Sequence, residues 1–343
     1  MLTRVKPTRS FPDELLSRYR QQGDPPADAA IATVADTAGR EGIGKLMQWL
    51  ADTSNFSTAQ QPEPIQQFFA NYARLPDWAD PDRMKRGMAF FKKHAGLIGI
   101  SLGTYALPYT YLGADGVQLL WLTERIKNDT ARRLQETGEW VFAVNDVKNW
   151  IDTSPKAILY TLKIRLIHAG ARWFGLQSGR WNMAWGMPVN QEDMAGTNLS
   201  FSYIVLRGLR KLGVSMTERE EEDYLHHINV VSWLNGATDD LIAHNLREAY
   251  HLDRAISKRQ FRASEAGAGL VKSLLNAIAN VAGGTSGSPE SVRNLAAGQM
   301  RFFLGNEYAD ALNLPNVPVE QRLASTVTRL SIFQRLIPAA PTI

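Results

Sequence analysis

One short block of the sequence combines residue types that can hold an iron porphyrin. It reads Arg165-Leu-Ile-His168-Ala-Gly-Ala-Arg172. In a helix, arginines three residues before and four residues after the histidine lie on the same face as the imidazole. A neutral imidazole can bind iron, and guanidinium groups can pair with haem propionates. His168 is therefore a candidate metal ligand, and Arg165 and Arg172 are candidate cofactor-binding residues. The alternative is a core histidine flanked by arginines that reach the surface.

A second pair of polar residues lies about thirty positions earlier. Arg133 and Thr137 are separated by four residues, so they project together from a helix. A guanidinium and a hydroxyl at this spacing can donate hydrogen bonds to dioxygen at an iron centre. This makes both of them candidate catalytic residues. The alternative is an exposed helix that carries an ordinary Arg–Glu pair.

A third block, which extends from Pro188 to Thr197, has the pattern of a helix start. Asn190 is a suitable N-cap, and Asp193 stands where a capping box usually has Glu or Gln. Capping is the simpler interpretation, and it is compatible with a place in the lining of a pocket.

The composition restricts the chemistry that these residues can perform. The 343 residues include no cysteine, which excludes disulfides, thiolate ligation and covalent haem attachment. Any haem must therefore be non-covalent and held by His, Tyr or Met. The 38 basic and 34 acidic residues are interspersed along the chain, which is not the pattern of a nucleic-acid-binding protein. The N-terminus lacks a secretory signal, so we expect a cytoplasmic protein.

The elements that position these residues are predicted to be helical throughout. We expect helices near 12–22, 42–53, 63–74, 82–94, 116–142, 155–175, 191–213, 216–233, 238–260, 264–282, 289–304 and 318–336. Gln22 to Ala35 is predicted to be a linker, and Gly283 to Pro289 a break. The uncharged stretch from Ala95 to Ala114 contains Pro108 and four glycines, which favours a buried pocket lining over a membrane span. We predict an N-terminal extension over 1–80, a core over 81–282 and C-terminal helices over 283–343 on the same domain.

In this order and spacing, the three blocks resemble the family of latex-clearing proteins (rubber oxygenases) and the fungal oxygenase MpaB. The similarity extends over roughly residues 80–320. It includes a late run from Arg301 to Asp310 that is followed by Leu314-Pro315. The resemblance implies an all-α, globin-like helical core with additional peripheral helices and one haem b. It implies that His168 is the proximal ligand and that Arg133 and Thr137 lie on the distal side. It also implies cleavage of carbon–carbon double bonds of isoprenoid chains with dioxygen.

The sequence departs from that family at two distal positions. Latex-clearing proteins can carry a lysine immediately before the threonine, and here that position is Glu136. The distal acid proposed as a base has no secure match, and Asp115 is the nearest candidate. Because no secretory signal is seen, a small hydrophobic alkene, terpenoid or lipid is a better expected substrate than solid polyisoprene.

Three alternatives remain open from the sequence. A haem protein that binds gas without turnover would share the same fold and cofactor. A helical scaffold without a cofactor would satisfy every simpler interpretation given above. A non-haem metal site near His226-His227, His244 and His251 is the third, although only one Glu-x-x-His motif occurs, at Glu248 and His251.

Overall fold

The computed structural model describes residues 8–123, 125–151, 155–286 and 288–327. Within these ranges the regular structure is helical, with one isolated bridge between Gly113 and Phe261. The prediction of an all-α fold is therefore confirmed. The elements are α1 (Asp13–Arg20), α2 (Pro25–Ala51), α3 (Glu63–Tyr72), α4 (Pro81–Ser101), the π-helical η1 (Leu102–Ala106), α5 (Leu107–Thr110), α6 (Gln118–Leu122), α7 (Arg125–Val144), η2 (Val147–Trp150), α8 (Lys156–Gln177), η3 (Met183–Trp185), α9 (Gln191–Phe201), α10 (Tyr203–Lys211), α11 (Glu218–Leu234), η4 (Asp239–Leu241), α12 (Leu246–Gln260), α13 (Glu265–Ser286), α14 (Pro289–Leu304), α15 (Asn306–Ala311) and α16 (Pro318–Val327).

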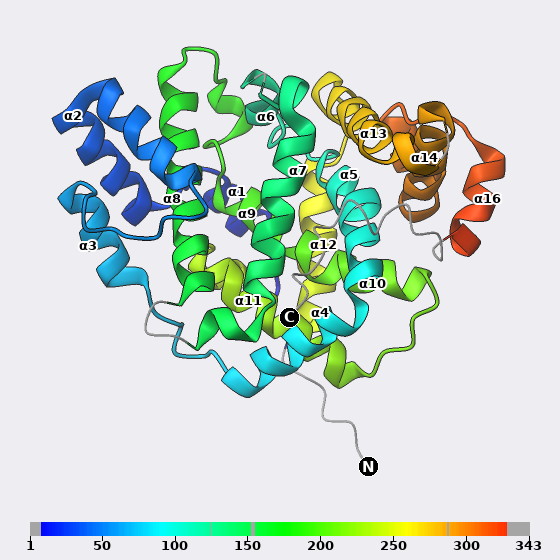
Figure 1. Ribbon diagram of the computed structural model, residues 1–343, viewed down its shortest axis with the longest axis horizontal. Coiled ribbons are helices and arrows are strands. Elements are labelled where there is room, and N and C mark those ends of the chain that lie inside the picture. The colour runs from blue at the N-terminus through cyan, green and yellow to red at the C-terminus, as the bar shows by residue number, and fades with distance from the viewer. Residues whose placement is uncertain (1–7, 124, 152–154, 287, 328–343) are drawn as a thin grey trace.

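Helix α8, which carries His168, lies between other helices on several sides. It packs against α2 and α3 on one side and against α7 and α11 on the others, while α13, α14 and α16 lie at the opposite end of the molecule (Figure 1). Leu162 and Leu166 of α8 are fully buried. Apolar residues all around this helix had predicted such a central place. The division of the chain near residues 80 and 282 stays a prediction.

The predicted linker from Gln22 to Ala35 is wrong, because most of it belongs to α2. Asp24 precedes Pro25 and Pro26, which occupy the first turn of the helix. Proline is well tolerated there, since the first N–H groups of a helix have no intrahelical partner. Helix α2 bends at Gly39, whose φ of 61° lies outside the helical region.

Several other boundaries differ from the expected ones. The helix expected over 116–142 is divided into α6 and α7, and the one over 191–213 is divided at Ser202 into α9 and α10. The predicted break at Gly283 begins too early, because α13 continues to Ser286. The polar residues at 152–154 that suggested the start of α8 lie outside the described residues.

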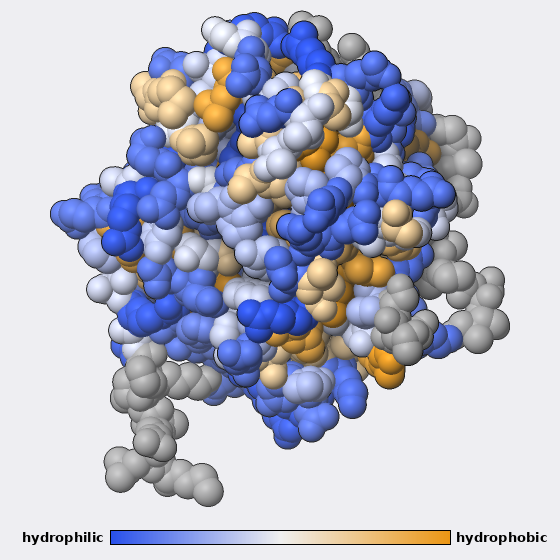
Figure 2. Space-filling model, turned by 90° about the vertical axis from the view of Figure 1, so that its left-hand side faces the viewer, coloured by the Kyte–Doolittle hydropathy of each residue, from blue (hydrophilic) through white to orange (hydrophobic). Residues whose placement is uncertain are grey.

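The apolar glycine-containing stretch forms the end of α4, then η1 and α5. Thr104 and Tyr105 of the π-helical turn are buried, and π-helical turns are frequent at functional sites. Over the described ranges, we find no helix with the length and hydropathy needed to cross a bilayer. On the side shown in Figure 2, the surface is mostly hydrophilic, with hydrophobic residues in small groups.

Two buried histidines of α11 predict a marked sensitivity of the fold to acid. Burial lowers the pKa of His227 to about 3 and that of His226 to about 4. Between the ordinary histidine pKa near 6.5 and these values, the unfolded chain binds protons that the folded protein does not. Stability is therefore lost as the pH falls through this window, by about 1.4 kcal/mol for each pH unit and each group.

Urea unfolding at a series of pH values measures this effect. We expect His227→Gln, at a position that is 0% exposed, to flatten the dependence between pH 6 and about 4. The same change at the exposed His251 is the control and should leave the profile unaltered. An unchanged profile for His227→Gln would contradict the prediction.

Candidate active site

His168 lies on α8 with its two ring nitrogens in different surroundings. Nδ1 is buried and has no hydrogen-bond partner among the described residues, whereas part of the side chain remains accessible. Burial, together with the positive charges of Arg172 and Arg133 and against the opposing effect of Asp24, lowers the pKa of His168 to about 4. The ring is therefore neutral near pH 7, which is the form that can bind a metal ion.

The two arginines of the block are held by acidic residues of α2. Arg165 binds Asp24 through Nε and Nη2, at 2.6 and 2.8 Å. Arg172 Nε binds Asp28 at 2.6 Å, and its Nη1 donates to the carbonyl oxygen of Val189 at 3.0 Å. The Nη2 atom of Arg172 is buried without a hydrogen-bond partner in the described part of the chain. Of the two arginines, Arg172 thus keeps a donor that an anionic group can use.

The buried pair of Arg165 and Asp24 predicts a large effect of a single replacement on stability. Arg165→Met leaves the Asp24 carboxylate, which is 5% exposed, without its cation, and this should lower the free energy of unfolding by about 3–5 kcal/mol. Urea unfolding measures the change. Lys45→Met removes an exposed ion pair with Glu41 and should change stability by less than about 1 kcal/mol. Equal effects of the two changes would refute the prediction.

Arg133 and Thr137 lie on the helix that faces α8. Trp140 of α7 donates a hydrogen bond to Thr161 of α8 at 3.1 Å. The short connection between the two helices makes them antiparallel neighbours. Moving seven residues away from this contact along each helix, about 10 Å, leads to Arg133 on α7 and to His168 on α8. Two turns of helix return to nearly the same face, so the two residues lie on the facing sides of α7 and α8.

The electrostatic effects agree with this arrangement. The charge of Arg133 acts on His168 and also on Tyr111, whose pKa burial raises to about 12. Tyr111 directly follows α5, so the apolar stretch predicted to line a pocket lies close to Arg133. Arg133 and Thr137 are both exposed. Glu136, next to Thr137, binds Arg132 at 2.8 Å, and both partners of this ion pair are exposed.

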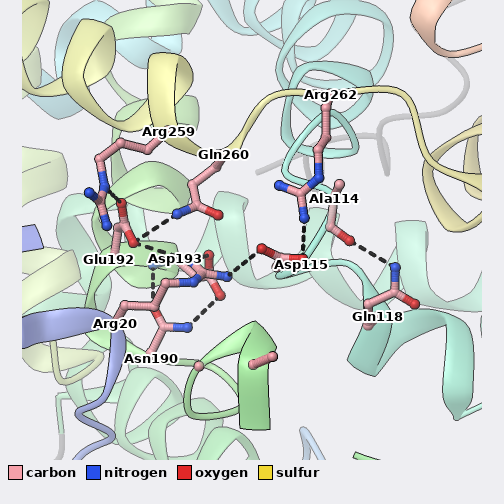
Figure 3. A network of polar contacts seen from close by, with 12 residues as sticks. Arg20, Ala114, Asp115, Gln118, Asn190, Glu192, Asp193, Arg259, Gln260 and Arg262 are labelled. Carbon is pink, nitrogen blue, oxygen red and sulfur yellow. Dashed lines mark hydrogen bonds and ion pairs between the residues drawn. The ribbon is translucent and has the colours of Figure 1, made fainter. Parts of the chain in front are cut away.

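A network of ion pairs surrounds Asp115 (Figure 3). Arg20 Nη1 lies 3.2 Å from Glu192 and 3.1 Å from Asp193, and its Nη2 lies 4.0 Å from Asp115. Arg262 also pairs with Asp115. Both partners of the Asp115 carboxylate are guanidinium groups, which is typical of a structural ion pair. Its role as a distal base stays a hypothesis.

Asn190 caps α9, as its sequence predicts. Its side-chain oxygen accepts a hydrogen bond from the backbone N–H of Asp193 at 2.9 Å. The Asp193 carboxylate accepts from the side-chain amide of Asn190 at 2.7 Å, whereas in a capping box it would accept from the backbone N–H of the cap. The same network includes Arg259 and Gln260, which bind Glu192 at 2.8 and 3.0 Å.

The histidines considered for a non-haem metal do not form a ligand cluster. The Nε2 atom of His226 accepts a hydrogen bond from the backbone N–H of Asp80, and His227 contacts the carbonyl oxygen of Val144. Among the residues that the structure describes, no group of three or more His, Asp or Glu side chains could hold an ion. The described part of the chain thus gives no support to the non-haem metal site considered from the sequence.

Asp24 and Asp28 were not predicted as parts of the site. They belong to the segment interpreted as a linker, although an Asp before two prolines is itself a helix-start signal. Treating Pro25 and Pro26 as the first turn of a helix would have placed both carboxylates near the start of α2. Their pairing with Arg165 and Arg172 depends on the tertiary packing of α2 on α8.

Comparison with known proteins identifies the family. The family model described as "ER-bound oxygenase mpaB/B'/Rubber oxygenase, catalytic domain" matches residues 97–339. A rubber oxygenase from Streptomyces sp. (strain K30) is 24% identical over 328 residues, which cover 93% of this chain and 78% of that protein. The solved structure of latex clearing protein LCP in the closed state has a TM-score of 0.72 at 22% identity and covers 94% of this chain and 87% of its own. Because the family model matches well over half of the residues, the chain belongs to the mpaB/rubber oxygenase family.

Proposed function

We propose that this protein is a haem b-dependent oxygenase that uses dioxygen to oxidise a hydrophobic alkene or isoprenoid-like substrate. The observation that supports this most directly is the neutral, partly accessible imidazole of His168, which faces the helix that carries Arg133. Membership of an oxygenase family supports the reaction class. A relative named rubber oxygenase suggests an unsaturated hydrocarbon as substrate.

The residues present fit a haem group by their chemistry. Two buried donors or acceptors of α8, Nδ1 of His168 and Nη2 of Arg172, lack hydrogen-bond partners in the described residues. Buried polar atoms are rarely left without a hydrogen bond. An anionic group bound beside α8 would give Nη2 of Arg172 an acceptor. With no cysteine in the chain, the group would be held without covalent thioether links.

Each side chain then has a distinct task. The ring of His168 would hold the iron, and the Nη2 group of Arg172 would be available to a propionate. Arg165, whose donors bind Asp24, fixes the orientation of α8. Arg133 and Thr137 would supply a guanidinium and a hydroxyl that can donate hydrogen bonds to dioxygen near the bound haem. When bound, haem supplies the redox-active iron centre at which dioxygen can react.

The apolar stretch through η1 serves the substrate. Its apolar side chains would contact a hydrophobic substrate, and its glycines would let a bulky hydrocarbon approach the backbone. A few polar groups in an apolar surrounding would position the carbon–carbon double bond of the substrate without binding the rest of its hydrocarbon chain tightly.

Absorbance spectroscopy of the haem-supplied protein tests the cofactor. We expect a Soret band whose position changes with dithionite and again with carbon monoxide. Oxygen uptake during incubation with a panel of alkenes and isoprenoids tests the reaction. A colourless protein after haem supply would overturn the proposal.

A haem protein that binds gas without turnover is the second candidate. It is favoured by Glu136, which binds Arg132 on the outer side of α7 and leaves that position without an amine that could approach the iron. A reversible carbon monoxide spectrum together with no substrate-dependent oxygen uptake would favour this second function.

A further inference from the structure

A segment that is rich in aromatic residues begins in the last turn of α8 and continues beyond it, and we define it as the aromatic loop, residues 176–187. Leu176 is 42% exposed and Met183 is 49% exposed, and both are among the most exposed large hydrophobic side chains of the described residues. Trp181 and Trp185 are partly exposed beside them. In Figure 1 the loop projects at the top of the molecule, beyond the end of α8. Exposed apolar groups gathered on a projecting loop indicate an interaction surface.

The aromatic loop is built to hold these side chains in place. The rings of Trp181 and Trp185 pack edge to face, with centroids 5.1 Å apart, and Trp181 Nε1 donates to the carbonyl oxygen of Gly186 at 2.9 Å. Gly186 has a φ of 88°, and a Cβ there would lie 2.7 Å from the carbonyl oxygen of Arg20. Glycine is therefore needed for this close approach. The loop presents Met183 from a fixed turn.

The aromatic loop carries one charged side chain, Arg180, and that charge is positive. The sequence from Pro155 to Gln191 contains no Asp or Glu. Arg180 is exposed and uses one N–H in a hydrogen bond of 2.9 Å to the carbonyl oxygen of Leu122. The indole N–H of Trp185 makes no hydrogen bond among the described residues. Indoles at the polar boundary, apolar side chains beyond them and a nearby cation form the combination that binds the interface of a phospholipid bilayer.

We propose that the aromatic loop docks the protein on the interfacial layer of an anionic phospholipid bilayer, with Leu176 and Met183 entering the apolar boundary and Arg180 meeting the headgroup phosphates. The loop projects from the surface and does not form a groove, so it can insert into a planar, deformable surface such as a bilayer. Its first residues belong to the last turn of α8, the helix that carries His168. Docking would therefore place the candidate active site close to hydrophobic molecules dissolved in the bilayer. The docking itself is independent of haem and of the proposed reaction.

Co-sedimentation of the full-length, haem-supplied protein with vesicles tests this proposal. We expect binding to phosphatidylcholine vesicles that contain phosphatidylglycerol, and weaker binding without phosphatidylglycerol or at high salt. The double change Leu176→Ser with Met183→Ser should weaken binding about tenfold or more, because two exposed apolar side chains no longer enter the bilayer. Arg180→Gln should weaken binding only to the anionic vesicles.

A matched control alters two exposed valines on other elements. Val281 is 45% exposed and Val319 is 65% exposed, and changing both to serine should leave vesicle binding unaltered. Acyl chains that carry bromine should quench part of the tryptophan fluorescence, and Trp181→Phe with Trp185→Phe should remove that quenching.

Three outcomes would overturn the docking. They are no sedimentation with either vesicle, equal losses in the loop and control variants, or a shift from dimer to monomer in light scattering that appears only when the loop is changed. The last of these would identify the loop as a contact between two copies of the chain. The Soret band of the same samples reports separately on the proposed function.

Discussion

Replacement of His168 by glycine is expected to abolish the Soret band of the haem-supplied protein. The ring is the nitrogen ligand of the proposed site, and none of the other described histidines lies in a ligand cluster. Loss of an iron ligand should weaken haem binding by more than about a hundredfold, since even residues that only support a ligand contribute ten- to a hundredfold. Titration of the apoprotein with haem, followed by absorbance, measures the change.

Added imidazole distinguishes ligand loss from unfolding. In His168→Gly the missing ring leaves a space of its own shape, and free imidazole should occupy it and restore the band in part. His251→Gly, on the exposed side of α12, is the control and should bind haem like the natural protein. A His168→Gly protein with an unaltered spectrum would exclude this histidine as the ligand.

Replacement of Arg20 by methionine is expected to destabilise the folded protein by about 3–5 kcal/mol at neutral pH. The guanidinium lies between the carboxylates of Glu192, which is 0% exposed, and Asp193. Without this guanidinium, the carboxylates of Glu192 and Asp193 repel each other, and because Glu192 is buried and Asp193 is partly buried, solvent screens this repulsion less than it would at the surface. Thermal or urea unfolding measures the loss.

The loss should become smaller as the pH is lowered. Burial raises the pKa of Asp193, and the charge of Arg20 opposes that rise, so removing Arg20 lets Asp193 take up a proton more readily. A protonated Asp193 no longer repels Glu192, and the variant regains part of its stability in mild acid. Arg18→Met is the control, because Arg18 is 57% exposed and 3.7 Å from the exposed Asp240. If the two changes have the same effect, the network does not stabilise the fold as argued.

Local patterns in the sequence predicted the central helix α8, whereas the role of His168 stays a prediction. The apolar residues around α8 and the spacing of Arg165, His168 and Arg172 are properties of a few consecutive turns, which local geometry determines. The cap at Asn190 was predictable for the same reason. Which faces of α7 and α8 contact each other could not be predicted in this way, because this depends on the hydrogen bond between Trp140 and Thr161 that joins the two helices.

The remaining differences have particular physical causes. Pro25 and Pro26 were interpreted as breaking a helix, although they occupy its first turn, where no N–H is needed. Gly283 and Gly284 suggested an end of α13, yet the helix continues to Ser286 and packs on α14. Tertiary packing can outweigh the roughly 1 kcal/mol by which a glycine weakens a helix.

The attachment of α2 to α8 has a consequence for where the folding unit begins. Besides the two arginine pairs, Lys163 donates hydrogen bonds to the carbonyl oxygens of Trp49, Asp52 and Asn55 at 2.6–2.7 Å, at the end of α2. A protein that began at residue 97, where the family match starts, would keep α8. Arg165 and Arg172 would then lose their acidic partners, and Lys163 would lose its carbonyl acceptors. The first fifth of the chain is therefore part of the same folding unit as α8.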